Sequence, residues 1–266
     1  MLRWLRKFLP ARRAEPSQTV FQTLRLIKAK YDAAATTDEN RRHWRNADDL
    51  SANAANNAEV RRLLRIRSRY EVANNSYAKG LVLTLAHDTV GTGPRLQMLT
   101  ADNSVNRRVE QEFSQWCRNV RLAEKLRTMR MARAADGEAF ALLTDNQALP
   151  SAIKLDVQQI ECDQVTTPDL SLKALREIDG IRFDDDGNPV EFHILRNHPG
   201  DPQAGIGFKY DRVPASSVIH YYRADRPGQS RGIPDITPAL PLFAHLRRYT
   251  LAVITAAEIA ALPGGV

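Results

Sequence analysis

Apolar residues in the first half of the chain recur at the spacing of amphipathic helices. Leu63 and Leu64 lie in a run from residue 58 to 74 in which apolar positions return every three or four residues. The same spacing continues after Ser76, a residue suited to cap a helix start, as far as about residue 88. Another periodic stretch covers roughly residues 104–131. The pattern predicts a succession of helices.

Short apolar runs replace the helical spacing in the middle of the chain. The segments 138–145 and 152–160 have the length and composition of strands, as does the run that begins at Val218. The sequence DDDGNP joins two further apolar runs, residues 180–184 and 189–196, and supplies the residues of a tight turn. This region is therefore predicted to be β-rich and to contain a hairpin.

The chain closes with an Ala-rich segment that again has helical spacing. Leu242, Leu246 and Tyr249 begin an apolar stripe that ends on the small residues Ala256 and Ala260. Small side chains allow helices of neighbouring subunits to approach closely, although an ordinary core helix has a similar stripe. The segment is predicted to be a long helix.

The order of these elements is helices, then strands, then a closing helix, which favours an α+β fold over a doubly wound sheet. Residues 36–57 are polar and Asn-rich, which is typical of a long loop or of an extended arm laid over a neighbouring surface. The expected organisation is a basic N-terminal arm over residues 1–35, a polar extended segment over 36–57, an α+β region over 58–234 and a closing helix that starts in 235–266.

Charge is concentrated at the N-terminus. Residues 1–30 carry eight Lys or Arg and one acid, so their net charge of +7 equals that of the whole chain, and the remainder is neutral. Such an arm favours polyanions through counterion release, and the alternative is a solvated tail without a partner. The apolar face of residues 4–9 allows a membrane-surface interpretation, but no apolar run approaches the length of a bilayer crossing. The candidate nucleic-acid contacts are Arg3, Arg6, Lys7, Arg12 and Arg13.

A second basic run, VRRLLRIRSRY, occupies residues 60–70 and contains no acid. Arg62, Arg65 and Arg69 fall on one face of the predicted helix. This face is interpreted as a solvated stripe whose ion-pair partners lie elsewhere in the chain, as a subunit contact, or as a nucleic-acid contact. We expect one of the first two.

The loop RADRPGQSRG, residues 223–232, joins the last predicted strand to the closing helix. It has too many charges for a core segment and too little chemistry for an active site. The neutral balance of the body argues against DNA as its partner. We expect Arg226, Gln229 and Arg231 to contact an adjacent subunit.

The sequence contains no motif of a nucleotide-binding or metal-binding class. The phosphate-binding pattern G-x-x-x-x-G-K-[ST] is absent from it. The DDDG segment fails as a calcium loop, because Arg182 and His193 would occupy ligand positions. The spacing of His193, His198 and Asp201 fits neither one strand face nor one helix face. We expect no metal and no cofactor.

Catalytic residues are not indicated either. Asp136 and Glu138 flank Gly137 at a predicted helix-to-strand transition, where a capping or turn role is the expectation, since no second partner for acid–base chemistry is visible. Cys117 and Cys162 stand alone and are predicted to be buried thiols. The chain is not expected to be an enzyme.

Several motifs, in order, resemble the lambda family of phage portal proteins, the head–tail connectors of the capsid. They are RIRSRYEVANNSYAKG with VGTG, DGEAFALL, FDDDGNPVEFHILRNHPGD, and VPASSVIHYYRADRPGQSRGIP. The family usually has Pro after the paired Asn, where this chain has Ser76. The residues that carry the family motif are Asn74, Asn75, Gly91, Gly93, Gly137, Phe140, His220 and Gly232.

The resemblance implies a portal subunit without catalysis of its own. It implies a ring of about twelve copies that conducts double-stranded DNA during packaging and ejection. The implied partners are the terminase large subunit, the major capsid protein and head-completion proteins. The implied location is the portal vertex of the virion, and the host cytoplasm during assembly. In these terms residues 58–234 are a wing region, and the closing helix leads toward the stem.

Portals of this family are generally longer, so the clip and crown would follow residue 266. The expectations for that difference are a truncated gene, a non-functional prophage remnant or a split reading frame. The alternative function is a basic-armed nucleic-acid-binding or scaffold protein that forms no ring.

Overall fold

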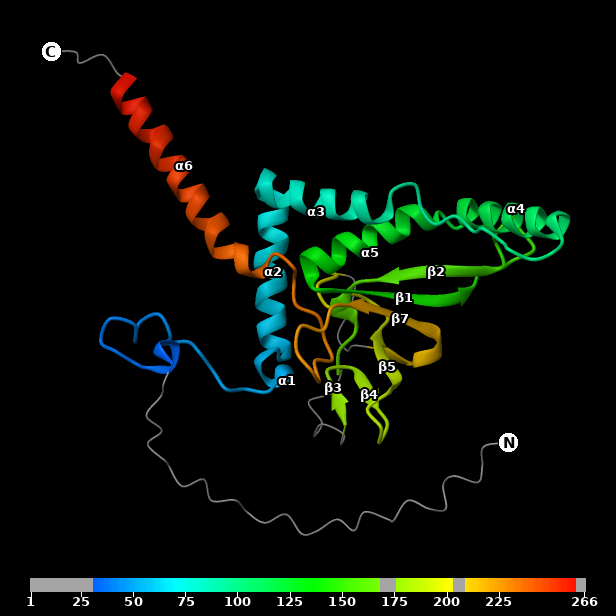
Figure 1. The fold of residues 1–266 in the computed structure, drawn as a ribbon, viewed down its shortest axis with the longest axis horizontal. Helices are drawn as coiled ribbons and strands as arrows, with labels where there is room; N and C mark the ends of the chain where they lie inside the picture. The colour runs from blue at the N-terminus through cyan, green and yellow to red at the C-terminus, as the bar shows by residue number, and fades with distance from the viewer. Residues whose placement is uncertain (1–30, 168–175, 203–208, 262–266) are drawn as a thin grey trace, which may run out of the picture. The chain divides into compact units, whose positions relative to one another are not determined.

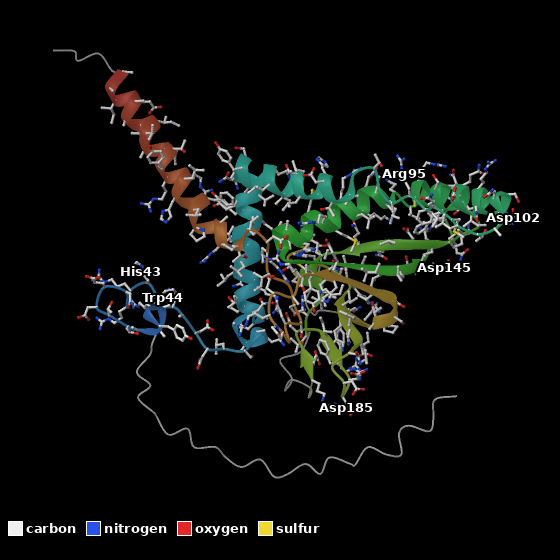
Figure 2. The ribbon with its side chains drawn as sticks, viewed as in Figure 1. His43, Trp44, Arg95, Asp102, Asp145 and Asp185 are labelled. Atoms are coloured by element: carbon white, nitrogen blue, oxygen red, sulfur yellow. The ribbon has the colours of Figure 1, made fainter. Side chains whose placement is uncertain are left out.

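The computed structural model describes residues 31–167, 176–202 and 209–261 (Figure 1). These residues fall into two units, with the boundary between Asp48 and Asp49. In the first unit a short 3₁₀ helix, η2 (Asp32–Ala34), precedes a series of turns. Thr37 and Asn40 exchange hydrogen bonds there, and Trp44 is half exposed (Figure 2). The second unit contains the remaining elements.

Helices dominate the first part of the second unit, as the apolar spacing predicts. Asparagine or aspartate caps the main ones: Asn57, Asn75 and Asp102 each accept backbone N–H groups at a helix start. The cap of the second long helix is therefore Asn75 and not Ser76. The helices are α1 (Ala52–Ala55), α2 (Ala58–Asn74), α3 (Ser76–Val90), α4 (Asn103–Asn119), α5 (Leu122–Asp136) and α6 (Leu240–Ala261).

The single helix expected over residues 104–131 is wrong, because the chain breaks between α4 and α5. Arg121 has a φ of 55°, in the left-handed region that interrupts a right-handed helix. The break lets Val120 and Leu122, on either side of it, both enter one hydrophobic core. Periodicity alone cannot detect such an elbow when the apolar spacing continues through it.

Two antiparallel sheets follow the helices. The first has the strand order β2-β1-β7, so its central strand is β1, and the second has the order β3-β4-β5-β6. The predicted hairpin is confirmed, since β4 pairs with β5 across the Asp184–Asn188 turn. The strands are β1 (Glu138–Asp145), β2 (Leu155–Ile160), β3 (Glu177–Ile178), β4 (Ile181–Phe183), β5 (Pro189–Leu195), β6 (Tyr210–Pro214) and β7 (Val218–Tyr222).

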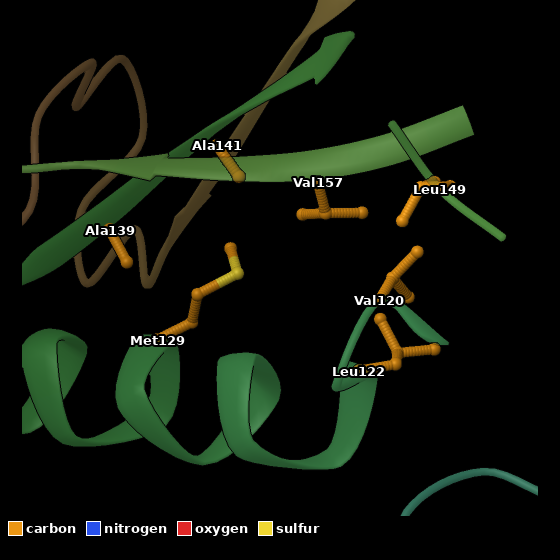
Figure 3. Close-up of a cluster of buried hydrophobic side chains, with 7 residues drawn as sticks. All are labelled: Val120, Leu122, Met129, Ala139, Ala141, Leu149 and Val157. Atoms are coloured by element: carbon orange, nitrogen blue, oxygen red, sulfur yellow. The ribbon is translucent and has the colours of Figure 1, made fainter. Parts of the chain in front are cut away.

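A hydrophobic core holds α5 on one face of the first sheet. Met129 points from α5 toward Ala139 and Ala141 of β1 and Val157 of β2 (Figure 3). On the opposite face, Phe140 packs with Phe192 of the second sheet. The helices and the antiparallel sheets thus share their cores, which confirms the α+β class.

The closing helix α6 packs on the rest of the unit only at its first turns. Leu240 and Phe243 are buried with residues of α3 and α5, whereas every residue from Arg248 to Ala261 is exposed. Short 3₁₀ turns, η3 (Cys162–Gln164), η4 (Ala215–Ser217) and η5 (Thr237–Ala239), complete the connections. In the part of the chain that the structure describes, no helix combines the length and hydropathy needed to span a bilayer.

Candidate functional site

Three arginines of α2, Arg61, Arg65 and Arg69, enter the body of the protein and meet acids from four other segments. Arg61 forms an ion pair with Asp179, in the turn between β3 and β4. Arg65 forms one with Glu138 of β1, and Asp163 of η3 lies 3.4 Å from it.

The next arginine along the same face, Arg69, forms ion pairs with three carboxylates, of which Glu161 is the most distant at 3.6 Å. Its Nε donates to Asp136 at 2.6 Å and its Nη2 to Asp163 at 2.5 Å. These pairs join α2 to the end of α5 and to η3. The basic face of α2 therefore lies at the contact between the helices and the sheets.

Glu138 is the centre of this network and is fully buried. Arg231 donates to its carboxylate from Nε at 3.0 Å and from Nη2 at 2.7 Å. The backbone N–H of Gly232 donates to it at 3.1 Å, and Nε2 of His220 lies 2.9 Å away. With Arg65, the carboxylate has the multiple partners that a buried charge requires.

Arg231 is as buried as Glu138 and is held on all sides by its own chain. Its Nη1 donates to the carbonyl of Val165 at 3.1 Å and its Nη2 to that of Cys162 at 3.4 Å. The guanidinium carbon lies 5.4 Å from the centre of the Phe140 ring. The loop therefore places one of its arginines in the core, contrary to the expectation that its charges keep it at the surface.

Two motif glycines allow this arrangement because their backbones touch. A Cβ on Gly232 would lie 2.0 Å from the carbonyl oxygen of Gly137. A Cβ on Gly137, where φ is +93°, would lie 2.5 Å from the backbone of Ile233. Only glycine fits at both positions, which explains why these motif residues belong together.

The other two central motif residues form an aromatic ladder beside the network. His220 stacks on Phe140 with ring centres 4.3 Å apart and on Tyr222 with ring centres 4.2 Å apart. The ladder fixes the imidazole so that its Nε2 faces Glu138. His220 thus has a structural partner on each side.

Burial and the arginines set the protonation of the network. Burial alone would raise the pKa of Glu138, but Arg231, His220 and Arg65 hold that pKa well below its usual range. Burial lowers the pKa of His220 despite the neighbouring carboxylate. The pair is therefore an anionic glutamate beside a neutral histidine that donates from Nε2. Burial raises the pKa of the Cys162 thiol, which keeps it protonated and unreactive.

The four remaining motif residues shape helix ends. Asn75 caps α3, and Asn74 closes α2 by donating to the carbonyl of Tyr70 at 2.8 Å. Gly91 ends α3 with a φ of 54°. A Cβ on Gly93 would lie 2.9 Å from that of Ala123, so this glycine lets the loop pass close to α5.

The residues predicted to contact a neighbouring subunit divide into two groups. Arg65, Gln229 and Arg231 are buried against their own chain, which corrects the expectation that they face another subunit. Gln229 instead closes the loop, because its side chain bonds the backbone at Asp225 and Arg231.

For Arg62, Arg69 and Arg226, the other residues of that group, contact with a neighbouring subunit stays a prediction. Arg62 is exposed and pairs with Glu59, and Arg226 is exposed and donates to the carbonyl of Leu50 at 3.0 Å. The side chain of Arg69 is about one-third exposed although its ion pairs are with residues of its own chain. The predicted arm residues Arg3, Arg6, Lys7, Arg12 and Arg13 lie outside the described residues.

The structure gathers one group of side chains with metal-ligand atoms. His198 faces Glu161 and Asp163, with ligand atoms within 4.8 Å of one another. His193 lies apart from them, next to Glu177 and Glu191. Since Asp163 is already bound by Arg69, the group reads as an extension of the ion-pair network.

Glu138 was missed as a functional residue by sequence reasoning. One feature of the sequence could have indicated its role, namely that charge is unbalanced in two separate segments. Residues 60–70 contain arginines and no acid, while Asp136 and Glu138 flank Gly137 with no basic residue directly next to them. That imbalance indicates pairing between segments but does not say which atoms meet.

The network has a structural role in this fold: its charged residues join the helices to the sheets, and the motif residues around it shape the backbone and hold His220 in place. Comparison with known proteins names the class of protein: residues 37–266 match the family described as phage portal protein, lambda family. The chain belongs to this family, whose members are structural proteins of the virion capsid. It is also 27% identical over 213 residues to a probable portal protein of Halomonas phage phiHAP-1, across 73% of this chain. The chain spans 41% of that relative's length.

Proposed function

We propose that the chain is a subunit of a portal ring at the unique vertex of a phage capsid, part of the conduit through which double-stranded DNA is packaged and ejected. The observation that carries the proposal is the part of α6 from Arg248 to Ala261, which is rich in apolar residues and exposed throughout. Leu251, Ile254 and Ile259 are 60%, 49% and 65% exposed. A helix of this composition needs a partner to cover it, and a ring of identical subunits supplies one at every position.

Ion pairs fix the root of α6, residues 235–247, to the rest of the α+β region. A ring of identical subunits requires such a fixed attachment. Asp235, five residues before the helix, pairs with Arg130 at 3.1 Å and Arg223 at 2.9 Å. Arg247 within the helix pairs with Glu71 of α2 at 2.5 Å. A rigid root holds the apolar part at a fixed angle to the body, and subunits must share one angle if a ring is to close.

The charge distribution supports a passive conduit without enzymatic activity. Outside residues 1–30 the basic and acidic side chains are equal in number. A tunnel that bound many phosphates would resist the movement of DNA, because each phosphate contact adds affinity. Docking of the terminase large subunit, the major capsid protein and head-completion proteins belongs to the same proposal.

Native mass spectrometry of the full chain tests self-assembly. The expected result is a closed species of about twelve copies, and a monomer at all concentrations contradicts the proposal. The exchange of Leu251 and Ile254 for Glu removes the apolar cover and is expected to abolish assembly. The matched control exchanges Val105 and Val109 on α4, which are also exposed, for Glu and is expected to assemble. Loss of assembly in both variants would show that the effect is not specific to α6.

A second candidate is nucleic-acid binding by the N-terminal arm without a ring, favoured by the +7 charge of residues 1–30. Deletion of these residues is then expected to abolish most salt-sensitive binding of duplex DNA in a gel-shift assay. Binding that survives the deletion at full strength would assign it to another surface. A monomer that shifts DNA would favour this candidate over the ring.

A further inference from the structure

A cleft at the elbow between α4 and α5 is lined by more arginines than carboxylates. Its volume is about 720 Å³. It is formed by the loop after α3, one face of α4 and the start of α5. The charged residues that line it are Arg95, Arg118, Arg121, Arg127, Glu110 and Glu124.

Both glutamates already have partners. Glu124 forms an ion pair with Arg121. Glu110 accepts a hydrogen bond from the backbone N–H of Met98 at 2.8 Å, which fixes the loop against α4. Glu110 keeps its negative charge, but four arginines against two carboxylates still leave the lining with a net positive charge.

Three of the arginines are left without a counter-charge. Arg118 donates to the neutral side chains of Ser114 at 2.8 Å and Gln115 at 2.7 Å. Arg127 reaches only a backbone carbonyl, at 3.4 Å. Among the residues that the structure describes, no carboxylate forms an ion pair with Arg95, Arg118 or Arg127. The cleft thus presents guanidinium groups to an external anion.

The shape of the cleft favours an acidic stretch of polypeptide over a nucleic-acid duplex. Pro94, Leu96 and Phe113 add apolar surface to its lining. A loop of a protein can enter a concave site of this kind and use both its apolar and its charged parts. The phosphates of a duplex are contacted instead by side chains that reach toward its backbone.

The same chain carries an acidic stretch at the tip of the β4–β5 hairpin. Asp184 belongs to the turn itself, because its carboxylate accepts the backbone N–H groups of Asp186 at 3.0 Å and Asn188 at 2.7 Å. Asp185 and Asp186 are exposed, the side chain of Asp185 by 86%. Asp185 pairs with Arg176, which is itself half exposed, and such surface pairs contribute little.

We propose that the cleft receives the Asp184–Asp186 turn of a neighbouring copy of this chain. Arg95 and Asp185 lie far apart in the subunit, so the contact forms between copies (Figure 2). Two different surfaces that complement each other make a head-to-tail contact, the type that generates rings. The inference rests on the proposed self-assembly and adds the residues that determine how neighbours align.

Reciprocal charge reversal tests the contact. One variant carries Arg95→Glu with Arg118→Glu in the cleft, and the other carries Asp185→Lys with Asp186→Lys in the turn. In each variant cleft and turn have the same sign, and self-association, measured by sedimentation velocity on the full chain, is expected to weaken at least about tenfold. In an equal mixture each cleft again meets a turn of opposite sign, so association is expected to return. Arg107→Glu with Arg108→Glu, exposed on the same helix but outside the cleft, is the control and keeps association.

The outcomes separate this inference from the ring itself. Assembly that is unchanged in both variants, or a mixture that does not recover, overturns the cleft-and-turn contact and leaves the ring in place. A wild-type chain that stays monomeric overturns both. Circular dichroism of each variant confirms that the subunit is folded. Weakening in the control equal to that of the cleft variant attributes the effect to net charge and also overturns the contact.

Discussion

The Glu138 network and the helix α6 reverse the usual relation between polarity and burial. Glu138 and Arg231 are charged and fully buried, whereas Leu251 and Ile259 are apolar and more than half exposed. The difference lies in where each group finds its partners. The charges of the network meet other charges of the same chain, while residues 248–261 of α6 are covered by no other residue that the structure describes. Burial thus reports the partners that a side chain has within the described chain, and the exposed part of α6 is the reason for the proposal of self-assembly.

Removal of the Glu138 carboxylate, the centre of the network, is expected to have the largest effect on stability. Glu138→Ala leaves Arg65 and Arg231 buried without a counter-charge and is expected to cost about 3–5 kcal/mol of unfolding free energy. Urea denaturation followed by circular dichroism measures it. Glu138→Gln keeps the shape and part of the hydrogen bonding and should cost less. A loss below about 1 kcal/mol for Glu138→Ala would show that the arginines find other partners.

The close backbone contact beside the network is expected to give the next largest effect. Gly232→Ala places a Cβ against the carbonyl of Gly137, and the strain is expected to cost about 1–3 kcal/mol. Gly187→Ala serves as a control: its φ is also positive, but nothing lies within 4 Å of its Cβ position. Equal losses of unfolding free energy in the two variants would attribute the effect to φ alone and not to the contact.

Acid should loosen the network in a defined direction. Since burial lowers the pKa of His220 below its ordinary 6.5, the unfolded chain binds the proton more readily, and stability falls as the pH drops below about 6.5. Glu138 has a lowered pKa as well, so its contribution is lost at still lower pH. One such group gives a slope of at most about 1.4 kcal/mol per pH unit. His220→Gln should flatten the curve just below pH 6.5, and an unchanged slope would contradict the assignment.

The smallest effect on stability is expected in α6, where the effect on assembly is the largest. Leu251 is 60% exposed and lies in the exposed part of α6, so with Leu251→Glu the free energy of unfolding of the monomer should change by less than about 0.5 kcal/mol. Thermal denaturation under conditions that keep the chain monomeric measures this. A large loss of unfolding free energy would mean that α6 is covered within its own chain in solution. The contrast between α6 and the Glu138 network would then disappear.

The sequence predicted most elements of the fold because their periodicity is local. Helices α2 and α3, the hairpin of β4 and β5, and the closing helix follow from apolar spacing and turn residues. The elbow at Arg121 could not be predicted, since it depends on how Val120 and Leu122 share a core. The short strands β3 and β6 were also missed, because few apolar residues mark them.

The candidate site was predicted in part. Motif resemblance selected Gly137, Phe140, His220 and Gly232, which the structure brings together around Glu138. Helical spacing placed Arg65 on one face of α2 but could not say what that face meets. The partners lie about 70 residues or more along the chain, as for Arg65 and Glu138, and local patterns carry no information on such distances.

The hydrogen bond from Gly232 to Glu138 makes one amide proton a reporter for the whole unit. That N–H is buried and its acceptor is held by Arg231 and His220. Its exchange with deuterium requires the network to open, so it should rank among the slowest amides, while those near the end of α6 exchange early. Because Gly232 lies just before the segment that leads to α6, its exchange rate would register any loosening of the helix root when copies of the chain come together.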